Sequence, residues 1–242
     1  MPASYDLVAV GDVMLDVHVS ASPLDGVVHD AIRVRAGGSA VNAARSARRL
    51  GAHAAVVGGV GDDAAGAAIR DALRRDGIDA LLEMLPAATG TVAYVGTGVV
   101  ADRGANASFR PGALPSARVT LVSGYLEEAA VREALTQAQG LRALDLQRPR
   151  VVHAFDADVV LGPELDLDAL GGRHDVVCST LGARGATGVR GDERVEVAVS
   201  RVLAESPRGA GDAFAAGFLL ALADGHELGA CLERGCEAAL HA

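Results

Sequence analysis

The chain has 242 residues, of which 50% are hydrophobic and 22% are charged, so it is long enough to enclose one large core. Its net charge of −9 and the lack of a Lys/Arg-rich run argue against nucleic acid as a partner, because phosphate backbones need a basic surface. No run of about 18 apolar residues occurs and the first residues do not resemble a signal peptide, so we expect a cytoplasmic protein without a membrane partner.

The first predicted element is a buried parallel strand over residues 7–10, closed by Gly11. Asp12 and Asp16 follow it. Ligands of open α/β sheets bind at the carboxyl ends of strands, so both carboxylates are placed to meet a polar substrate, although Asp12 also fits ordinary turn chemistry. Residues 17–36 alternate in short pieces around a predicted turn at Pro23 and Gly26, which indicates an antiparallel flap.

Gly37 and Gly38 open a predicted helix whose apolar positions recur at helical spacing until Gly51. Asn42 falls in its first turn. An amide there can bond the hydroxyls of a polyol or satisfy the start of the helix, and the two preceding glycines favour the first interpretation. A strand over 54–57 and a helix over 64–76 follow, and this succession predicts a parallel sheet covered by helices.

The middle of the chain predicts further β structure. Residues 89–95 and 98–100 indicate strands, a polar turn runs from Asp102 to Asn106, and a core strand over 120–124 precedes a helix over 127–139. The remaining predicted elements are strands over 151–152, 159–161 and 176–179, a short helix over 165–170, an edge strand over 195–199, and helices over 210–223 and 228–240. We find no internal repeat, linker or low-complexity tract.

A glycine-rich turn stands directly before the helix predicted over 210–223. Gly209, Ala210 and Gly211 have almost no side chains, so their N–H groups can converge on an anion at the positive end of the helix. Asp212 lies in the first helical turn. A carboxylate beside anion-binding amides can take a proton from a hydroxyl while the amides hold a phosphoryl group. The alternative is a turn followed by an Asp that only favours the helix dipole.

Two separate motifs, in the right order, resemble the signatures of the ribokinase-like (PfkB) carbohydrate kinase family. The first is GGSAVNAA over residues 37–44 with GVGDDAAG over 59–66, and the second is GAGDAFAAGF over 209–218. The resemblance spans nearly the whole chain. It implies one domain over residues 1–242, a three-layer α/β/α sandwich with a mostly parallel central sheet, and a small β-sheet lid from residues 17–36 and 89–110. ATP and Mg²⁺ are the implied cofactors.

The resemblance also assigns roles to individual residues. Asp212 would be the catalytic base, with the Gly209, Ala210 and Gly211 amides as the anion hole. The substrate-binding positions would be Asp16, Gly37, Gly38, Asn42, Arg103 and Asn106. The nucleotide-binding turn would contain Thr180, Gly182 and Gly185.

The chain departs from the family pattern in two places. Ser206, Pro207 and Arg208 replace the usual Asp-Thr-x before the glycine turn, so activation by a monovalent cation is not expected. Arg208 can supply positive charge to ATP phosphates or remain a solvated surface side chain. The family's Asn-x-x-Glu element has no clean match, and its best counterpart places Asp166 as the metal ligand.

The expected function is ATP-dependent phosphorylation of a hydroxyl group on a sugar or sugar-like small molecule. Two alternatives stay open: a nucleoside kinase of the same family, and a catalytically weak or inactive sugar-binding protein on this fold. Only 3% of the residues are aromatic, which leaves few rings for stacking a base and favours a sugar. An apolar flap would suit a homodimer through the lid, and a monomer whose flap closes on ligand is the alternative.

Overall fold

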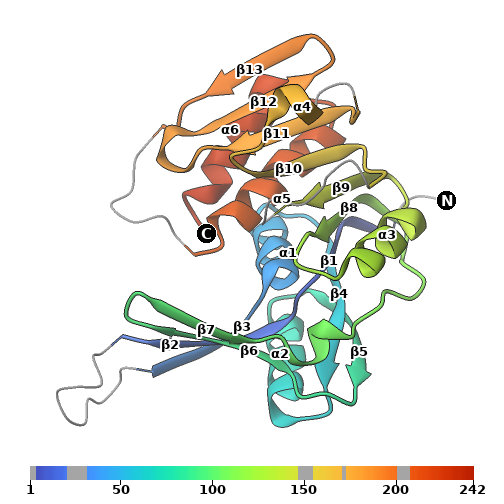
Figure 1. Cartoon of the computed structure of the whole chain (residues 1–242), viewed down its shortest axis with the longest axis vertical. Helices are drawn as coiled ribbons and strands as arrows, with labels where there is room; N and C mark the ends of the chain where they lie inside the picture. The colour runs from blue at the N-terminus through green and yellow to red at the C-terminus, as the bar shows by residue number, and fades with distance from the viewer. Residues whose placement is uncertain (1–3, 21–31, 147–154, 171–172, 201–207) are drawn as a thin grey trace.

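A nine-stranded sheet forms the centre of the protein, which a computed structural model describes over residues 4–20, 32–146, 155–170, 173–200 and 208–242. The strand order is β13-β12-β11-β10-β9-β8-β1-β4-β5 (Figure 1), and pairing is parallel from β5 to β11 and antiparallel for the last two. The strands are β1 (Tyr5–Val10), β4 (Ala54–Gly61), β5 (Asp79–Leu85), β8 (Ala117–Ser123), β9 (Leu141–Asp145), β10 (Val159–Pro163), β11 (Val176–Thr180), β12 (Ala186–Arg190) and β13 (Glu193–Val197).

Helices cover both faces of this sheet. One core cluster packs the sheet against α1 (Ser39–Arg49), α2 (Ala64–Arg75), α5 (Ala210–Ala223) and α6 (Leu228–Ala239). A second core cluster packs the opposite face against α3 (Glu128–Gln137) and α4 (Leu167–Leu170). The strands between them are apolar on both faces, as β4 shows by being buried throughout. The predicted three-layer α/β/α sandwich is therefore confirmed.

A separate four-stranded sheet projects from one side of the sandwich (Figure 1). Its order is β3-β2-β6-β7, built from β2 (Met14–Val19), β3 (Ile32–Gly37), β6 (Gly90–Val95) and β7 (Gly98–Asp102). We call this sheet the lid. The antiparallel pairing of β2 with β3 confirms the predicted flap, although β2 begins at Met14 because Met14 pairs with both Gly37 and Gly90.

The lid presents two different faces. Side chains alternate along its strands, so Asp16, Val92 and Ala101, which are paired across the sheet, share one face with His18 and Tyr94. Val34 and Val100 lie on the other face, where Val34 is 57% exposed and Val100 is 72% exposed. The face toward the cavity described below therefore mixes polar and apolar side chains, whereas the other face exposes valines to solvent.

Each predicted helix and strand that falls within the described residues is present, and three further strands were not predicted. The helix predicted over 210–223 has the bounds of α5, and the edge strand predicted over 195–199 is β13. Strands β5, β9 and β12 were not predicted. The strand predicted over 151–152 and the turn at Pro23 and Gly26 lie outside the described residues. No helix in the described part of the chain has the length and apolar character needed to cross a bilayer.

Candidate active site

A cavity of about 510 Å³ lies where the lid meets the carboxyl ends of the central strands and the start of α5. Residues from the N-terminal part of the chain, such as Asp16 and Asn42, line this cavity together with residues from the first turn of α5. Its lining residues are Asp12, Met14, Asp16, Gly38, Ser39, Asn42, Val92, Tyr94, Val99, Ala101, Arg103, Tyr125, Glu127, Gly209, Gly211 and Asp212.

The pair Asn42–Asp212 is the centre of this cavity. The Nδ2 group of Asn42 donates to Oδ2 of Asp212 at 3.0 Å, across 170 residues of sequence. Helix α1 places Asn42, whose backbone N–H bonds the Gly38 carbonyl at 3.0 Å. Helix α5 places Asp212 in its first turn, after Gly209 with φ 82° in the left-handed region. The two predicted motifs therefore meet at one hydrogen bond.

Burial makes the Asp212 carboxyl a stronger base than an ordinary aspartate. Burial is the largest cause that raises its pKa well above the usual value, and the charges of Asp145 and Asp16 raise it further. The hydrogen bond from Asn42 acts in the opposite direction. A raised pKa increases the affinity of the carboxylate for a proton, which is the property a general base needs.

The start of α5 leaves amide donors available for an anion. Gly209 makes no side-chain capping hydrogen bond, and the helix dipole adds partial positive charge at this end. Gly209 and Gly211 both line the cavity beside Asp212. The backbone amides of this helical turn can thus bind a phosphoryl group while the neighbouring Asp212 carboxylate accepts a proton.

Asp16 reaches the cavity from the lid. It is 2% exposed, and its Oδ2 lies 3.6 Å from Nε of Arg35, whereas Oδ1 has no hydrogen-bond partner within the described parts of the chain. Burial raises the pKa of this carboxyl, and the positive charge of Arg35 partly opposes that effect. A Cβ on Gly37 would stand 2.2 Å from Asp16 Oδ2, so a larger residue there would displace the Asp16 carboxylate.

Arg103 lies at the lid edge of the cavity and Asn106 beneath it. Arg103 pairs with Glu127 at 2.9 Å and with Asp12 at 3.4 Å, which keeps its guanidinium beside the cavity. Asn106 is 1% exposed and bonds both backbone groups of Val13, at 2.8 Å and 2.9 Å. These bonds suit a residue that holds the segment before β2, and a direct contact of Asn106 with a substrate stays a prediction.

The predicted nucleotide-binding turn follows β11. Thr180 ends that strand, and the parallel pairing puts its end on the same sheet edge as the ends of β9 and β10. Gly182 and Gly185 have φ values of 60° and 107°, and a Cβ on Gly185 would stand 2.0 Å from the Val197 carbonyl oxygen. The turn therefore needs glycine for its own packing. It does not line the Asp212 cavity, so its contact with nucleotide stays a prediction.

Arg208 and Asp166 have protein partners in the structure. The Arg208 guanidinium lies over the Tyr94 ring, 4.0 Å from its centroid. Asp166 is exposed, and its Oδ1 accepts hydrogen bonds from the N–H groups of Asp168 and Ala169, which caps α4. No group of three His, Cys, Asp or Glu side chains within the described ranges is arranged to hold a metal. Ser206 and Pro207 lie outside those ranges.

Comparison with known proteins gives one decisive match. The family model described as pfkB family carbohydrate kinase matches residues 5–158 and 163–241. The chain belongs to the pfkB family of carbohydrate kinases.

Solved structures of pfkB-like kinases share this fold. An adenosine kinase from Sinorhizobium meliloti is 25% identical with a TM-score of 0.82, and the match covers 98% of this chain and 93% of that chain. A probable sugar kinase from Rhizobium etli CFN 42 is 20% identical with a TM-score of 0.82, over 98% and 92%. An Arabidopsis thaliana ribokinase complexed with ribose and ATP is 21% identical with a TM-score of 0.75, over 98% and 92%. These neighbours confirm the ribokinase-like fold.

One carboxylate that acts on this pfkB-family site was not identified from sequence. Asp145 is 4% exposed at the end of β9 and acts on Asp212 through its charge. The sequence offered no clear signal for Asp145, because β9 is short, carries Arg142 and was not predicted as a strand. Outside the cavity, Asp63 accepts hydrogen bonds from Thr89 Oγ1 at 2.6 Å and from the Gly66 N–H at 2.8 Å, which lower its pKa and join α2 to the start of β6.

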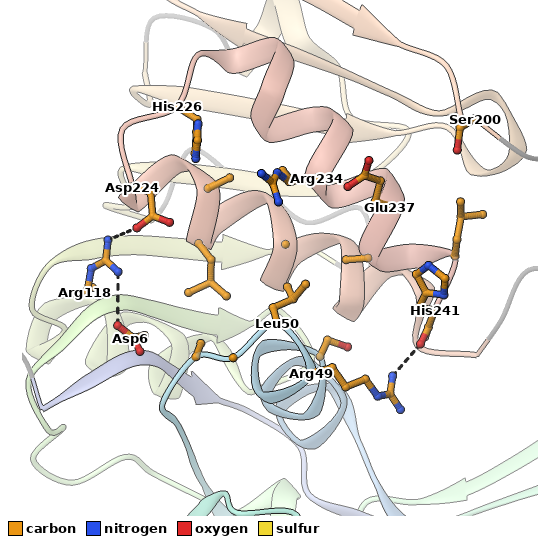
Figure 2. A pocket seen from close by; sticks show the side chains of 18 residues that line it. Asp6, Arg49, Leu50, Arg118, Ser200, Asp224, His226, Arg234, Glu237 and His241 are labelled. Carbon is orange, nitrogen blue, oxygen red and sulfur yellow. Dashed lines mark hydrogen bonds and ion pairs between the residues drawn. The ribbon is translucent and has the colours of Figure 1, made fainter.

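A larger cavity of about 740 Å³ lies elsewhere, between α1, α5 and α6 (Figure 2). Figure 2 shows Arg118 bonded to both Asp6 and Asp224, and Arg49 bonded to the His241 carbonyl. Neither Asp212 nor the glycine turn lines it. The smaller cavity is therefore the candidate active site of this pfkB-family protein, because it alone of these two joins the half-buried Asp212 carboxylate, whose pKa is raised, to the glycine turn at the start of α5.

Proposed function

We propose that this protein transfers the γ-phosphoryl group of ATP to a hydroxyl of a sugar or sugar-like molecule. The Asn42–Asp212 hydrogen bond at the uncapped start of α5 carries the proposal, because it joins an amide that binds hydroxyls to a carboxylate that accepts protons. Family membership supports a kinase, and the position of Asp16 and Arg103 on the same cavity supports a polyhydroxylated acceptor.

In the proposed mechanism the acceptor hydroxyl lies between Asp212 and the γ-phosphorus. Asp212 accepts the hydroxyl proton while the oxygen forms a bond to phosphorus, and the bond from phosphorus to the β,γ-bridging oxygen breaks to leave ADP. The Gly209, Ala210 and Gly211 amides hold the phosphoryl oxygens. Asn42 and Asp16 orient the acceptor, and the lid excludes water that would otherwise compete as acceptor.

The start of α5 fits the phosphates of ATP, since Gly209 and Gly211 line the cavity and no side chain among the described residues caps this helix end. Mg²⁺ would reduce the charge of the phosphates, and it is held mainly by substrate phosphates and water with one or two carboxylates. A dedicated protein cluster is therefore not required. Asp166 as a metal ligand stays a prediction. If its Oδ1 bound a metal, it would lose the hydrogen bond from the Ala169 N–H that caps α4.

A panel assay tests the proposal. Purified protein with ATP and Mg²⁺ is offered a set of sugars and a set of nucleosides, and ADP release is measured. ADP release that depends on one sugar supports the proposed function. Thermal stabilisation by a sugar without turnover would instead support a sugar-binding protein that has lost catalysis.

A nucleoside kinase is the second candidate, favoured by the 25% identity to the adenosine kinase from Sinorhizobium meliloti. The cavity contains the rings of Tyr94 and Tyr125, which a base could contact. The nucleoside arm of the same assay decides between the two acceptor classes. ADP release with nucleosides alone would replace the sugar in the proposal and leave the role of Asp212 unchanged.

The pH dependence of turnover provides a test of Asp212. Only the deprotonated carboxylate accepts a proton, so activity is lost as pH falls through its raised pKa. Asp145→Asn removes a nearby negative charge, lowers the pKa of Asp212, and should shift the acid limb of kcat to lower pH. Asp192→Asn is the control, because that exposed carboxylate is not among the causes of the shift. An acid limb unchanged in Asp145→Asn would contradict the assignment.

We also propose that two copies associate through the lids. Ile32, Val34 and Val100 are 65%, 57% and 72% exposed, which is unusual for large apolar side chains grouped on one sheet face. Light scattering should give twice the mass of the chain. Val100→Lys should give the single mass, while Val99→Lys on the opposite face should not. A cytoplasmic location and a single domain over the whole chain stay predictions.

A further inference from the structure

One contact joins the lid to the loop that carries the anion hole. The guanidinium carbon of Arg208 lies 4.0 Å from the centroid of the Tyr94 ring. Arg208 directly precedes Gly209, and Tyr94 lies on lid strand β6. Both Gly209 and Tyr94 line the same cavity, so the contact bridges its two walls.

The Tyr94 ring makes a second contact, with His18. His18 pairs with Tyr94 across β2 and β6, and the two rings stack with centroids 4.7 Å apart and planes inclined by 17°. A rotation of the Tyr94 ring away from Arg208 would therefore also disturb its stack on His18.

The charges around the ring favour this arrangement. Burial is the largest cause that lowers the pKa of His18, and the positive charge of Arg35 lowers it further, so the imidazole is neutral at neutral pH and does not repel Arg208. Burial and the charge of Asp16 raise the pKa of Tyr94, which keeps the phenol neutral. A neutral ring with a negative face attracts the guanidinium.

We propose that Arg208 is a positioning residue that ties the lid to the anion-hole turn through Tyr94. Opening of the lid would separate β6 from the start of α5 and break the contact, so the contact raises the population of the closed cavity. The inference rests on the proposed function only for its effect on catalysis. The tie itself is a property of the free protein and can be measured without ATP or acceptor.

Hydrogen exchange tests the tie directly. Arg208→Ala should speed amide exchange in residues 90–102 about two- to fivefold, the range of one exposed cation–π contact, and leave residues 117–123 unchanged. Tyr94→Leu should give at least the same change, because it also removes the stack on His18, and Tyr94→Phe should give less because its ring keeps both contacts. Arg184→Ala, at an exposed arginine of the turn after β11, is the matched control.

A double variant separates a tie from two independent effects. Arg208→Ala combined with Tyr94→Leu should exchange no faster than Tyr94→Leu alone, because the arginine has no ring left to contact in that background. The chain has three tyrosines and no tryptophan, so the aromatic NMR signals of Tyr94 can be assigned with Tyr94→Phe and should move in Arg208→Ala.

The effect on catalysis is a second readout. If the protein is a kinase, Arg208→Ala should raise KM for the acceptor about two- to fivefold and raise ATP hydrolysis without acceptor, because the lid excludes water less well. Unchanged exchange and unchanged Tyr94 signals in Arg208→Ala would overturn the tie. Changed exchange without any kinase activity would uphold the tie and reject the proposed function instead.

Discussion

Asp212→Asn is expected to lower phosphoryl transfer by about 10²–10⁴-fold, the usual contribution of a general base. The substitution keeps the shape of the side chain, and the new amide oxygen can still accept the hydrogen bond from Asn42. It removes only the capacity to take the acceptor proton. Steady-state ADP release with the acceptor found in the panel measures the effect, and a variant with parental kcat would overturn the assignment of Asp212.

The same variant should be more stable than the parent at neutral pH. Burial raises the pKa of Asp212 in the folded state, so its contribution to stability is full below the unfolded pKa and is lost as pH rises through the folded pKa. Asn cannot ionise, so the variant does not lose this stability as pH rises. We expect Tm to rise by about 2–4 °C at neutral pH, which corresponds to about 1 kcal/mol in a chain of this size. The gain should shrink toward pH 4, and Asp192→Asn should show no gain.

Gly38→Ala is expected to destabilise the protein by about 3–5 kcal/mol, at the upper end for single substitutions. Gly38 has φ 91°, and a Cβ there would stand 2.2 Å from the Asp12 carbonyl oxygen, which is backbone and cannot move aside cheaply. Its own carbonyl accepts from Asn42, so any shift reaches the Asn42–Asp212 pair. Urea unfolding measures the loss.

Gly51→Ala is the matched control for Gly38→Ala. Gly51 has φ 89°, close to that of Gly38, but a Cβ there would meet nothing within 4 Å. It should cost only the backbone strain of a left-handed residue, about 1–2 kcal/mol. Equal losses in the two variants would show that strain alone, and not the contact with Asp12, explains the requirement for glycine at position 38.

The centre of the site was accessible from sequence because its two halves lie in motifs with local physical meaning. Asn42 follows two glycines at a helix start, and Asp212 follows a glycine turn at another. Each motif alone was ambiguous. Their resemblance to one family, in the right order, predicted that they act on the same substrate, and the 3.0 Å bond between them places them together.

The surroundings of that pair depend on tertiary contacts that no local pattern encodes. Strand β9 is short and carries Arg142 and Asp145, so its sequence lacks the apolar run of a core strand. Asp145 was therefore not placed beside Asp212. The bonds of Asn106 to Val13 and the position of Arg208 over Tyr94 join segments 93 and 114 residues apart, and both follow from how the lid is docked.

The unpaired oxygen of Asp16 has a consequence for selectivity. In the free protein, Oδ1 is buried without a hydrogen bond from any residue the structure describes, a state that is unfavourable for a carboxylate. An acceptor whose hydroxyl donates to this oxygen relieves the cost, whereas a deoxy analogue that lacks the hydroxyl leaves it in place. Sites built to bond a hydroxyl can reject such analogues by about 10⁴–10⁵-fold. The lid would thus distinguish ligands by a missing oxygen atom more sharply than by their size.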